Sequence, residues 1–390
     1  MSELPAPSAD ELELSDALAR LIHEEIAAAG GSLPFSRFME LCLYAPGMGY
    51  YSAGHRKFGP GGDFVTAPEI SPLFGRALAR ACAPLLDSLG SGAEILEFGA
   101  GSGQLAIDLL GELDSLECLP GRYLILERSA DLKERQQQAI AKHLPQLLDR
   151  VVWIDSLPVS GFRGVMLANE VLDAMSVERF RWDGERAALF HVCSEAGNFA
   201  WQLQPGNSNA TSDHLTDSLS GLDLAVGYES EINTSLQPWL QAVSDSLQQG
   251  LLLLIDYGYP QHEYFHPQRS SGTLMCHYRQ HAHADPLILP GLQDITAHVD
   301  FTAVAEAALA ADLEVAGYTA QTYFLLDCGL DELLQRCGPI ESVAYLKAAQ
   351  QVKTLLLPGE MGERFKCIGL TRGIDDPVPG FRLQDQRERL

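Results

Sequence analysis

A glycine-rich turn between a predicted strand and a predicted helix is the strongest chemical signal in the sequence. It reads Glu97-Phe98-Gly99-Ala100-Gly101-Ser102-Gly103. Glycines allow the backbone to turn sharply and to approach a ligand closely beside a helix N-terminus. Their spacing is G-x-G-x-G rather than the G-x-G-x-x-G that is typical of dinucleotide sites. The residues that we expect to contact a cofactor are Gly99, Ala100, Gly101 and Gly103.

The acid that precedes the first glycine indicates which cofactor the turn would suit. A carboxylate at Glu97 would repel a pyrophosphate, which disfavours a dinucleotide-dependent oxidoreductase. S-adenosylmethionine carries a sulfonium and an α-ammonium and no phosphate, so Glu97 would suit that cation. A purely structural strand-to-helix turn is the alternative interpretation of the same residues.

Further polar residues follow the next two predicted strands. Glu127 ends the strand 122–127, where a carboxylate can accept hydrogen bonds from both ribose hydroxyls of a nucleoside. Asp155 and Ser156 follow the strand 151–154 and could lie near the adenine edge of the cofactor. For Asp155, a solvated position after the strand is an equally good interpretation.

Two acidic groups are candidates for the acceptor side of the site. Asn169 and Glu170 follow the strand 164–168, where a methyl acceptor would meet the cofactor. Glu170 could bind a cationic acceptor or act as a base, or it could be a helix N-terminal carboxylate that the helix dipole favours. Glu229 and Glu231 form a second acidic cluster farther along the chain.

The histidines and cysteines do not indicate a metal site. Five histidines lie between residues 262 and 283, but neither a cysteine pair nor an acidic triad completes a ligand set. We therefore expect no metal, and we expect the segment from His277 to His283 to be a loop that lines the substrate cleft. The eight cysteines include no C-x-x-C pair, and such unpaired thiols fit a reducing cytoplasm.

These residues need a scaffold that brings the ends of several strands together. From residue 93 onward the predicted elements alternate, in the order strand 93–98, helix 105–113, strand 122–127, helix 129–143, strand 151–154, strand 164–168, helix 235–248 and strand 251–255. Strands joined by helices in this way form an α/β fold with a doubly wound, mostly parallel sheet. The carboxyl ends of such strands converge on a ligand site.

Outside this alternation the expected elements are less regular. Residues 1–12 look like a flexible tail, and Ser15 could cap a first helix. A loop rich in glycine and proline runs from residue 45 to residue 68. The stretch 178–203 predicts one or two β-hairpins, and the polar segment 205–220 predicts a surface loop.

We accordingly expect two parts in the chain. Residues 1–75 would form an N-terminal helical extension with the glycine-rich loop, and residues 76–390 would form the main α/β domain. That domain would carry insertions near 178–230 and 257–300, which are expected to act as cap segments.

Charge and hydropathy exclude several classes of protein. Of the 390 residues, 27 are Lys or Arg and 52 are Asp or Glu, so the net charge is −25. This field would repel nucleic acid and could attract a basic partner, although an equally simple interpretation is that the charge only keeps the protein soluble. No apolar run approaches the length of a bilayer span, and the acidic amino end resembles neither a secretion signal nor a transit peptide. We expect a cytoplasmic protein with no membrane partner.

Six segments occur in order along the chain, at 61–71, 96–103, 168–174, 254–258, 294–301 and 361–365. Together they resemble the MidA-like family of class I S-adenosylmethionine-dependent methyltransferases. That family includes a mitochondrial protein arginine methyltransferase of complex I assembly. The resemblance covers roughly residues 34–370, with one departure at Ser176, where relatives often carry proline.

The resemblance implies a Rossmann-like fold and a methyltransferase that modifies an arginine of a protein substrate. Guanidinium stays protonated in water and is a poor nucleophile, but paired carboxylates can accept its donors and orient its free nitrogen. The expected pair is Glu170 with Glu231 or Glu229, and Asn169 would lie at the edge of the cofactor or the acceptor. The loop 61–71, with Asp63 and Thr66, would close over the cofactor.

Two other functions remain open at this point. A small-molecule methyltransferase would use similar cofactor chemistry, although the large insertions favour a macromolecular substrate. A non-catalytic assembly factor could keep a cofactor site without using it, although the complete glycine turn argues against this. The sequence leaves open whether the chain forms a homodimer.

Overall fold

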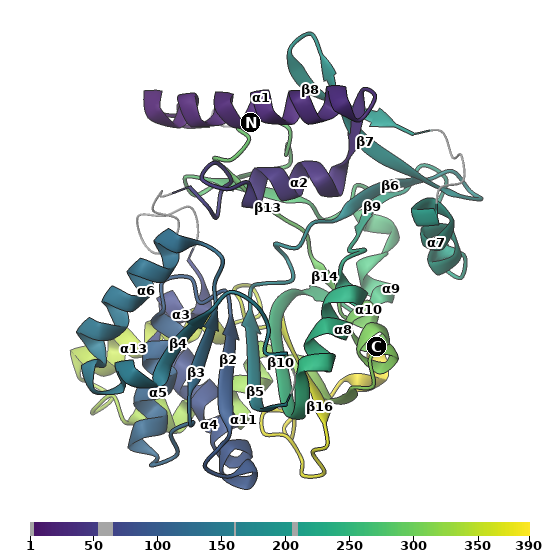
Figure 1. Ribbon diagram of the computed structural model, residues 1–390. Coiled ribbons are helices and arrows are strands. Elements are labelled where there is room, and N and C mark those ends of the chain that lie inside the picture. The colour runs from purple at the N-terminus through teal and green to yellow at the C-terminus, as the bar shows by residue number, and fades with distance from the viewer. Residues whose placement is uncertain (1–3, 54–64, 160, 205–209) are drawn as a thin grey trace.

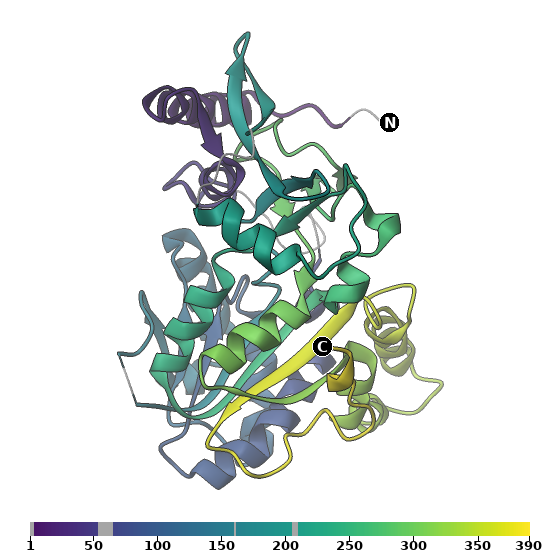
Figure 2. The same ribbon diagram turned by 90° about the vertical axis from the view of Figure 1, so that its right-hand side faces the viewer.

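The structure is a computed structural model in which residues 4–53, 65–159, 161–204 and 210–390 are described. The described chain forms an α/β layer and a cap above it, as Figures 1 and 2 show from two directions. The α/β layer contains the central sheet. The cap contains the N-terminal helices and most of the inserted segments.

The central sheet confirms the predicted mostly parallel topology. Its strand order is β15-β16-β10-β5-β2-β3-β4, and the short strand β14 pairs with β10. Strands β4, β3, β2, β5 and β10, which are neighbours in this order, run parallel to one another. Strand β16 runs antiparallel to both β10 and β15. The strand bounds are β2 Glu94–Phe98, β3 Tyr123–Leu126, β4 Val151–Ile154, β5 Phe162–Asn169, β10 Leu247–Tyr259, β14 Val299–Asp300, β15 Glu314–Ala320 and β16 Phe365–Arg372.

Helices cover both faces of this sheet, because successive strand residues point to opposite sides. Leu251 and Leu253 of β10 pack in a core cluster with α4 and α5, whereas Leu252 and Leu254 pack in a second cluster with α8 and α10. Within the described ranges, no helix combines the length and apolar composition needed to cross a membrane. The helix bounds in this layer are α3 Ala67–Ile70, α4 Pro72–Leu89, α5 Gln104–Ser115, α6 Ala130–His143, α8 Leu236–Ser246, α9 Gln261–Tyr264, α10 Phe301–Ala310, α11 Gln321–Asp327, α12 Leu330–Gln335 and α13 Val343–Leu356.

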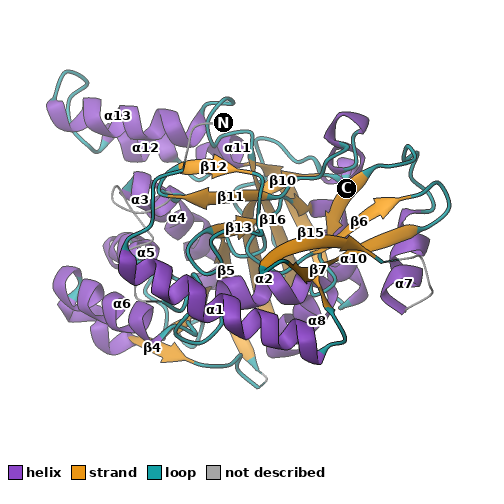
Figure 3. Ribbon diagram, turned by 90° about the horizontal axis from the view of Figure 1, so that it is seen from above, coloured by secondary structure: helices purple, strands orange, loops and turns teal. Residues whose placement is uncertain are grey.

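The cap is assembled from segments that lie far apart in the sequence. Strand β1 of the N-terminal part pairs with β7 of the first insertion, and Leu18 and Phe38 share an apolar cluster with Cys276 and Ile295 of the second. Figure 3 looks down on this cap, with α1 and α2 in front of the central strands. The elements are α1 Ala9–Ala28, β1 Ser32–Pro34, α2 Phe35–Tyr44, β6 Glu178–Trp182, β7 Ala187–Glu195, β8 Asn198–Leu203, α7 Ala210–Leu219, β9 Glu229–Ile232, β11 Met275–Tyr278, β12 His281–His283 and β13 Asp294–Thr296.

The first helix begins earlier than the sequence analysis predicted. The cap residue is Ser8, whose hydroxyl accepts from the Glu11 backbone N–H while the Glu11 carboxylate accepts from the Ser8 N–H. This reciprocal pair is the capping box, which satisfies two otherwise free donors of the first turn. Ser15 lies inside the helix, is buried, and donates to the Pro290 carbonyl at 2.9 Å. The expected tail therefore contains the helix start.

The expected surface loop at 205–220 is also wrong for its second half, which forms α7. Leu215 and Leu219 are four residues apart and therefore lie on one face of this helix. Both are buried in the cluster that contains Phe180 and Trp182 of β6. The tertiary packing of these two leucines, rather than a strong local propensity, stabilises the helix.

Candidate active site

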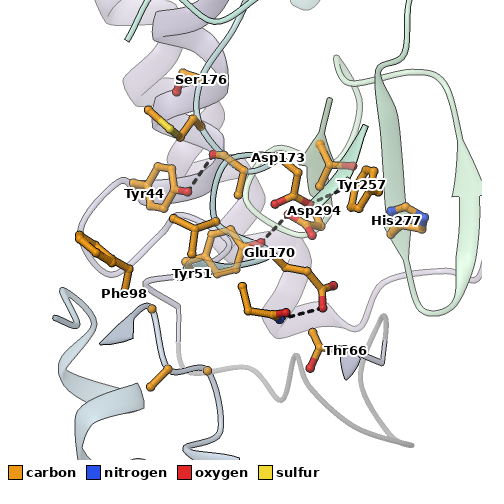
Figure 4. Close-up of a pocket in the computed structure, with 18 of the residues that line it drawn as sticks. Tyr44, Tyr51, Thr66, Phe98, Glu170, Asp173, Ser176, Tyr257, His277 and Asp294 are labelled. Carbon is orange, nitrogen blue, oxygen red and sulfur yellow. Dashed lines mark hydrogen bonds between the residues drawn. The ribbon is translucent and has the colours of Figure 1, made fainter. Parts of the chain in front are cut away.

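A cavity of about 1070 Å³ lies between the carboxyl ends of the sheet strands and the cap. Its wall combines the turn after β2, the loop after β3, the segment after β5 and the end of β10 with residues of α2, β11 and β13. The chain therefore places several predicted functional segments around one space. Figure 4 shows part of the lining, with Phe98 and Thr66 toward its edges and several acidic and tyrosine side chains between them.

The glycine turn forms one wall of this cavity. Gly99, Ala100 and Gly101 line it, whereas Gly103 lies at the start of α5, outside the lining. Gly99 and Gly101 adopt positive φ angles of 61° and 53°, in the left-handed region that disfavours side chains. The Gly99 N–H donates to the Leu126 carbonyl at 3.0 Å and so ties the turn to β3. Because Gly99, Ala100 and Gly101 carry no side chain beyond Cβ, a ligand in the cavity could approach the backbone of this turn closely.

Two buried acids border this turn. Glu97 lines the cavity and accepts a hydrogen bond from the Tyr123 hydroxyl at 2.7 Å. Burial is the main reason that its pKa rises to about 7. Glu127 also lines the cavity and accepts from the Ser129 N–H at 2.9 Å, and burial raises its pKa as well. A cationic nucleoside ligand would offset the cost of keeping these acids ionised.

We expect Glu127→Ala to weaken cofactor binding by roughly 1–3 kcal/mol, the range for losing hydrogen bonds to a charged group. Titration calorimetry with S-adenosylhomocysteine measures the change. Asp155→Asn is a matched control, because its carboxylate lies outside the cavity. A dissociation constant for the Glu127 variant that equals that of the wild type would move the ribose acid elsewhere.

Four other predicted cofactor residues have different outcomes. Asp155 is exposed, forms an ion pair with Lys133 and does not line the cavity. Ser156 is exposed and does not line it either. Thr66 does line it, and Asp63 lies outside the described residues. The solvated interpretation of Asp155 therefore fits the geometry better, because its carboxylate is exposed and paired with Lys133.

On the acceptor side, Glu170 has an unusual backbone. Its φ of 53° is in the left-handed region, which is strained for a residue with a side chain and recurs at functional sites. Its N–H donates to the Ile255 carbonyl at 2.9 Å, which holds this conformation. The carboxylate accepts from the Asn169 side-chain amide at 3.1 Å and lies 3.4 Å from the Ala67 N–H. Burial, followed by the charge of Asp173, raises its pKa to about 8.

Two further carboxylates lie beside Glu170 in the cavity wall. Asp173 accepts from the Tyr257 hydroxyl at 2.6 Å, and Asp294 accepts from the Tyr51 hydroxyl at 3.0 Å. Figure 4 shows the three acids gathered in one part of the cavity. The second oxygen of Asp173, Oδ1, is buried and has no hydrogen-bond partner among the described residues. An unpaired buried acceptor is costly, so this oxygen suits a donor that a ligand brings.

A fourth acid, Asp256, binds the backbone of the segment that carries Asp173. Asp256 is buried, does not line the cavity, and accepts from the backbone N–H groups of Leu172 and Asp173 at 3.0 and 3.2 Å. It thereby fixes the turn that carries Asp173. Burial and the charges of Asp173 and Glu170 hold its pKa well above the ordinary value.

The structure does not bring the expected partners of Glu170 to the cavity. Glu229 is paired with Arg179 at 2.9 Å and with Arg181, and it does not line the cavity. Glu231 is buried in the cap, where it accepts from the Thr273 N–H and hydroxyl at 2.7 and 3.1 Å. Arginines bind the Glu229 carboxylate, and Thr273 binds one oxygen of Glu231, whose Oε1 is buried without a hydrogen-bond partner among the described residues. Asp173 and Asp294 stand beside Glu170 instead.

The histidine segment forms the β11–β12 hairpin rather than the expected loop, and it lies partly at the cavity. His277 and Ala282 line it, from β11 and β12. His298, from the segment after β13, lines it too, and burial lowers its pKa to about 4, so this ring is neutral at physiological pH. No group of three or more potential metal ligands occurs in the part of the chain that the structure describes.

The raised pKa of Glu170 predicts a pH-dependent stability. Its pKa is about 8 in the folded chain against an ordinary 4.5, so between these values the folded chain binds a proton that the unfolded chain has released. Stability contributed by this proton is present at low pH and is lost as the pH rises toward 8. We expect Glu170→Gln to melt at a higher temperature than the wild type at pH 8.5, with a smaller difference at pH 5.5. An equal difference at both pH values would contradict the raised pKa.

The comparisons with known proteins agree with this geometry. Residues 77–319 match the family described as "Putative S-adenosyl-L-methionine-dependent methyltransferase". A Burkholderia thailandensis protein, whose crystal structure has S-adenosyl-homocysteine bound, is 44% identical with a TM-score of 0.94, and the match covers 100% of both chains.

Curated animal relatives are more distant. "Protein arginine methyltransferase NDUFAF7 homolog, mitochondrial" of Caenorhabditis elegans is 26% identical over 94% of this chain and 89% of the relative. The Drosophila melanogaster protein of the same name is 27% identical over 97% of this chain and 92% of the relative. These names overturn the expected cytoplasmic location, because they place the relatives in mitochondria.

The cavity fits the cofactor of the matched family. It offers a backbone cradle and two buried acids, and it is wide enough for a nucleoside and a second reactant. The carboxylates suit the two positive groups of S-adenosylmethionine. Since the family match extends over more than half of the 390 residues, the chain belongs to this family of S-adenosylmethionine-dependent methyltransferases.

Proposed function

We propose that this methyltransferase modifies an arginine side chain of a protein. The observation that carries the proposal is the group of three carboxylates, Glu170, Asp173 and Asp294, on one side of the cavity. Guanidinium is a planar cation with five donors, and carboxylates bind it with paired hydrogen bonds. Asp173 Oδ1, which has no hydrogen-bond partner in the described part of the chain, offers an acceptor for one of these donors.

The residues proposed to hold the cofactor also line the cavity. Gly99, Ala100 and Gly101 would cradle it, Glu127 would accept from the ribose, and Glu97 and Thr66 would complete the wall. When bound, S-adenosylmethionine supplies an electrophilic methyl group. The chain must orient the acceptor nitrogen toward that group, and such alignment can lower the barrier by several kcal/mol.

The guanidinium must also release a proton, because its pKa lies above about 12. Glu170 would receive it in its ionised form, which predominates above its pKa of about 8 and is favoured further when a cationic acceptor binds beside it. Asp173 and Asp294 would keep the positive charge of the acceptor in place during the transfer. Asn169 would fix the Glu170 carboxylate through its 3.1 Å hydrogen bond.

Two independent features support a protein as the acceptor. The curated relatives are named protein arginine methyltransferases. The insertions that form much of the cap also contribute to the cavity wall, through β11, β12 and β13, and insertions of this size favour a macromolecular acceptor.

The proposal can be tested in an extract of a strain that lacks the gene. Purified protein and labelled S-adenosylmethionine are added, and the label is measured separately in the protein precipitate and in the small-molecule fraction. We expect label in protein, released as methylarginine on hydrolysis. Label confined to small molecules, or to another amino acid, would refute the proposal.

A further inference from the structure

Gln136 of α6 is a buried side chain for which the chemistry above gives no role. It is 0% exposed, although glutamine is rarely found fully buried. Its Nε2 donates to the Gly101 carbonyl at 3.0 Å and to Glu127 Oε2 at 3.1 Å. Its Oε1 accepts from the indole N–H of Trp153 at 2.9 Å. One amide thus joins the glycine turn, the loop after β3 and the strand β4.

The orientation of this amide is fixed by its neighbours. An indole N–H can only donate, so Trp153 requires the amide oxygen on its side. The two amide hydrogens then face the Gly101 carbonyl and the Glu127 carboxylate, both of which can only accept. A flipped amide would lose all three hydrogen bonds and set the oxygen against a carbonyl and a carboxylate. The arrangement therefore has a single low-energy state.

Gln136 also packs against the turn itself. A Cβ added at Gly103 would lie 3.5 Å from the Cα and Cγ of Gln136, so its side chain lies directly behind the turn. On Glu127, the two carboxylate oxygens have different partners, the Ser129 N–H for Oε1 and Gln136 for Oε2. Removing Gln136 would take away the side-chain donor to Oε2.

We propose that Gln136 is a positioning residue of the cofactor site, which sets the Glu127 carboxylate for the ribose hydroxyls and fixes the Gly101 carbonyl. The inference rests on the proposed placement of Glu127 against the ribose. Trp153 contributes by selecting the orientation of the amide. A purely structural role for Gln136 would stabilise the fold without affecting how the ribose is distinguished.

The experiment is titration calorimetry with S-adenosylhomocysteine and with its 2′,3′-dideoxy analogue. The ratio of the two dissociation constants measures how strongly the site recognises the ribose hydroxyls. The variants are Gln136→Met, which keeps the length without the hydrogen bonds, and Gln136→Glu, which places a second carboxylate beside Glu127. Gln138→Met on the same helix is the matched control, because Gln138 is exposed and its amide donates to Glu134, away from the glycine turn and Glu127.

We expect Gln136→Met to weaken S-adenosylhomocysteine binding roughly 10- to 100-fold, which is the effect of one lost hydrogen bond to a charged group. Binding of the dideoxy analogue should change much less, so the ratio falls. Gln136→Glu should weaken binding at least as much, because the added carboxylate repels Glu127. Gln138→Met should bind both ligands like the wild type.

Two results would overturn the inference. An equal loss for both ligands in Gln136→Met, with the ratio unchanged, would assign Gln136 a structural role only. A ratio unchanged in Glu127→Gln would show that Glu127 does not contact the ribose, and the inference would fall with it. Neither result bears on the arginine acceptor, so the proposed function is tested separately. Melting temperatures of all variants identify any that fail to fold. If Gln136→Met does not fold, the two dissociation constants are compared for Gln136→Glu instead.

Discussion

Glu170→Gln should lose most methyl transfer while it binds S-adenosylmethionine nearly as well as the wild type. The amide keeps the shape of the carboxylate but removes its charge, and its own donors then face the donors of the guanidinium. Losing one partner of a buried charge pair costs several kcal/mol, so we expect transfer to fall about a hundredfold or more. Single-turnover transfer and cofactor titration on the same sample measure both properties.

A control and two contrary outcomes define this test. Glu24→Gln changes an exposed acid of α1 and should transfer normally. Unimpaired transfer by Glu170→Gln would refute the role of this carboxylate. Parallel loss of cofactor binding would place Glu170 in the cofactor site and leave Asp173 and Asp294 as the acceptor carboxylates.

Gly101→Val should abolish cofactor binding and leave the fold largely intact. Gly101 has a φ of 53° and lines the cavity, so a β-branched side chain would be strained and would also occupy the cradle. We expect affinity for S-adenosylhomocysteine to fall roughly a hundredfold or more, which corresponds to about 3 kcal/mol. Calorimetry measures the affinity, and circular dichroism reports the fold.

Gly92→Val is the matched control for this substitution. Gly92 is exposed, has an ordinary φ, and a Cβ there would meet nothing within 4 Å. It should bind the cofactor normally. If Gly101→Val binds with the affinity of the wild type, the glycine turn is not the cradle.

The parallel sheet could be predicted from the sequence because each strand is a short apolar run with a polar residue after it. The run before the glycine turn and the strand Val151–Ile154 lie where the pattern indicated. Strand β10 extends beyond the predicted apolar run 251–255 at both ends. Residues before the run pair with β5, and residues after it pair with β16. Local pattern indicates the buried centre of a strand better than its ends.

The acceptor side could be predicted only in part. Glu170 follows a strand, so its place at the cavity follows from topology, whereas the choice of its partner carboxylates depends on tertiary contacts. Asp173 lies only three residues farther along, and Asp294 reaches the cavity from β13 of the cap. From the sequence alone, Glu229 and Glu231 were equally suitable partners of Glu170, but Arg179 binds Glu229 and Thr273 binds Glu231 in the cap. Spacing along the chain could not distinguish these cases.

The central claim is that the methyl group goes to an arginine held beside Glu170. It is tested most directly by tandem mass spectrometry of a purified substrate protein after incubation with this chain and S-adenosylmethionine. The account predicts a methyl group on one arginine, absent from an arginine-to-lysine variant of that substrate and from a reaction with Glu170→Gln. A methyl group on another residue type, or one that Glu170→Gln still adds at the full rate, would contradict it.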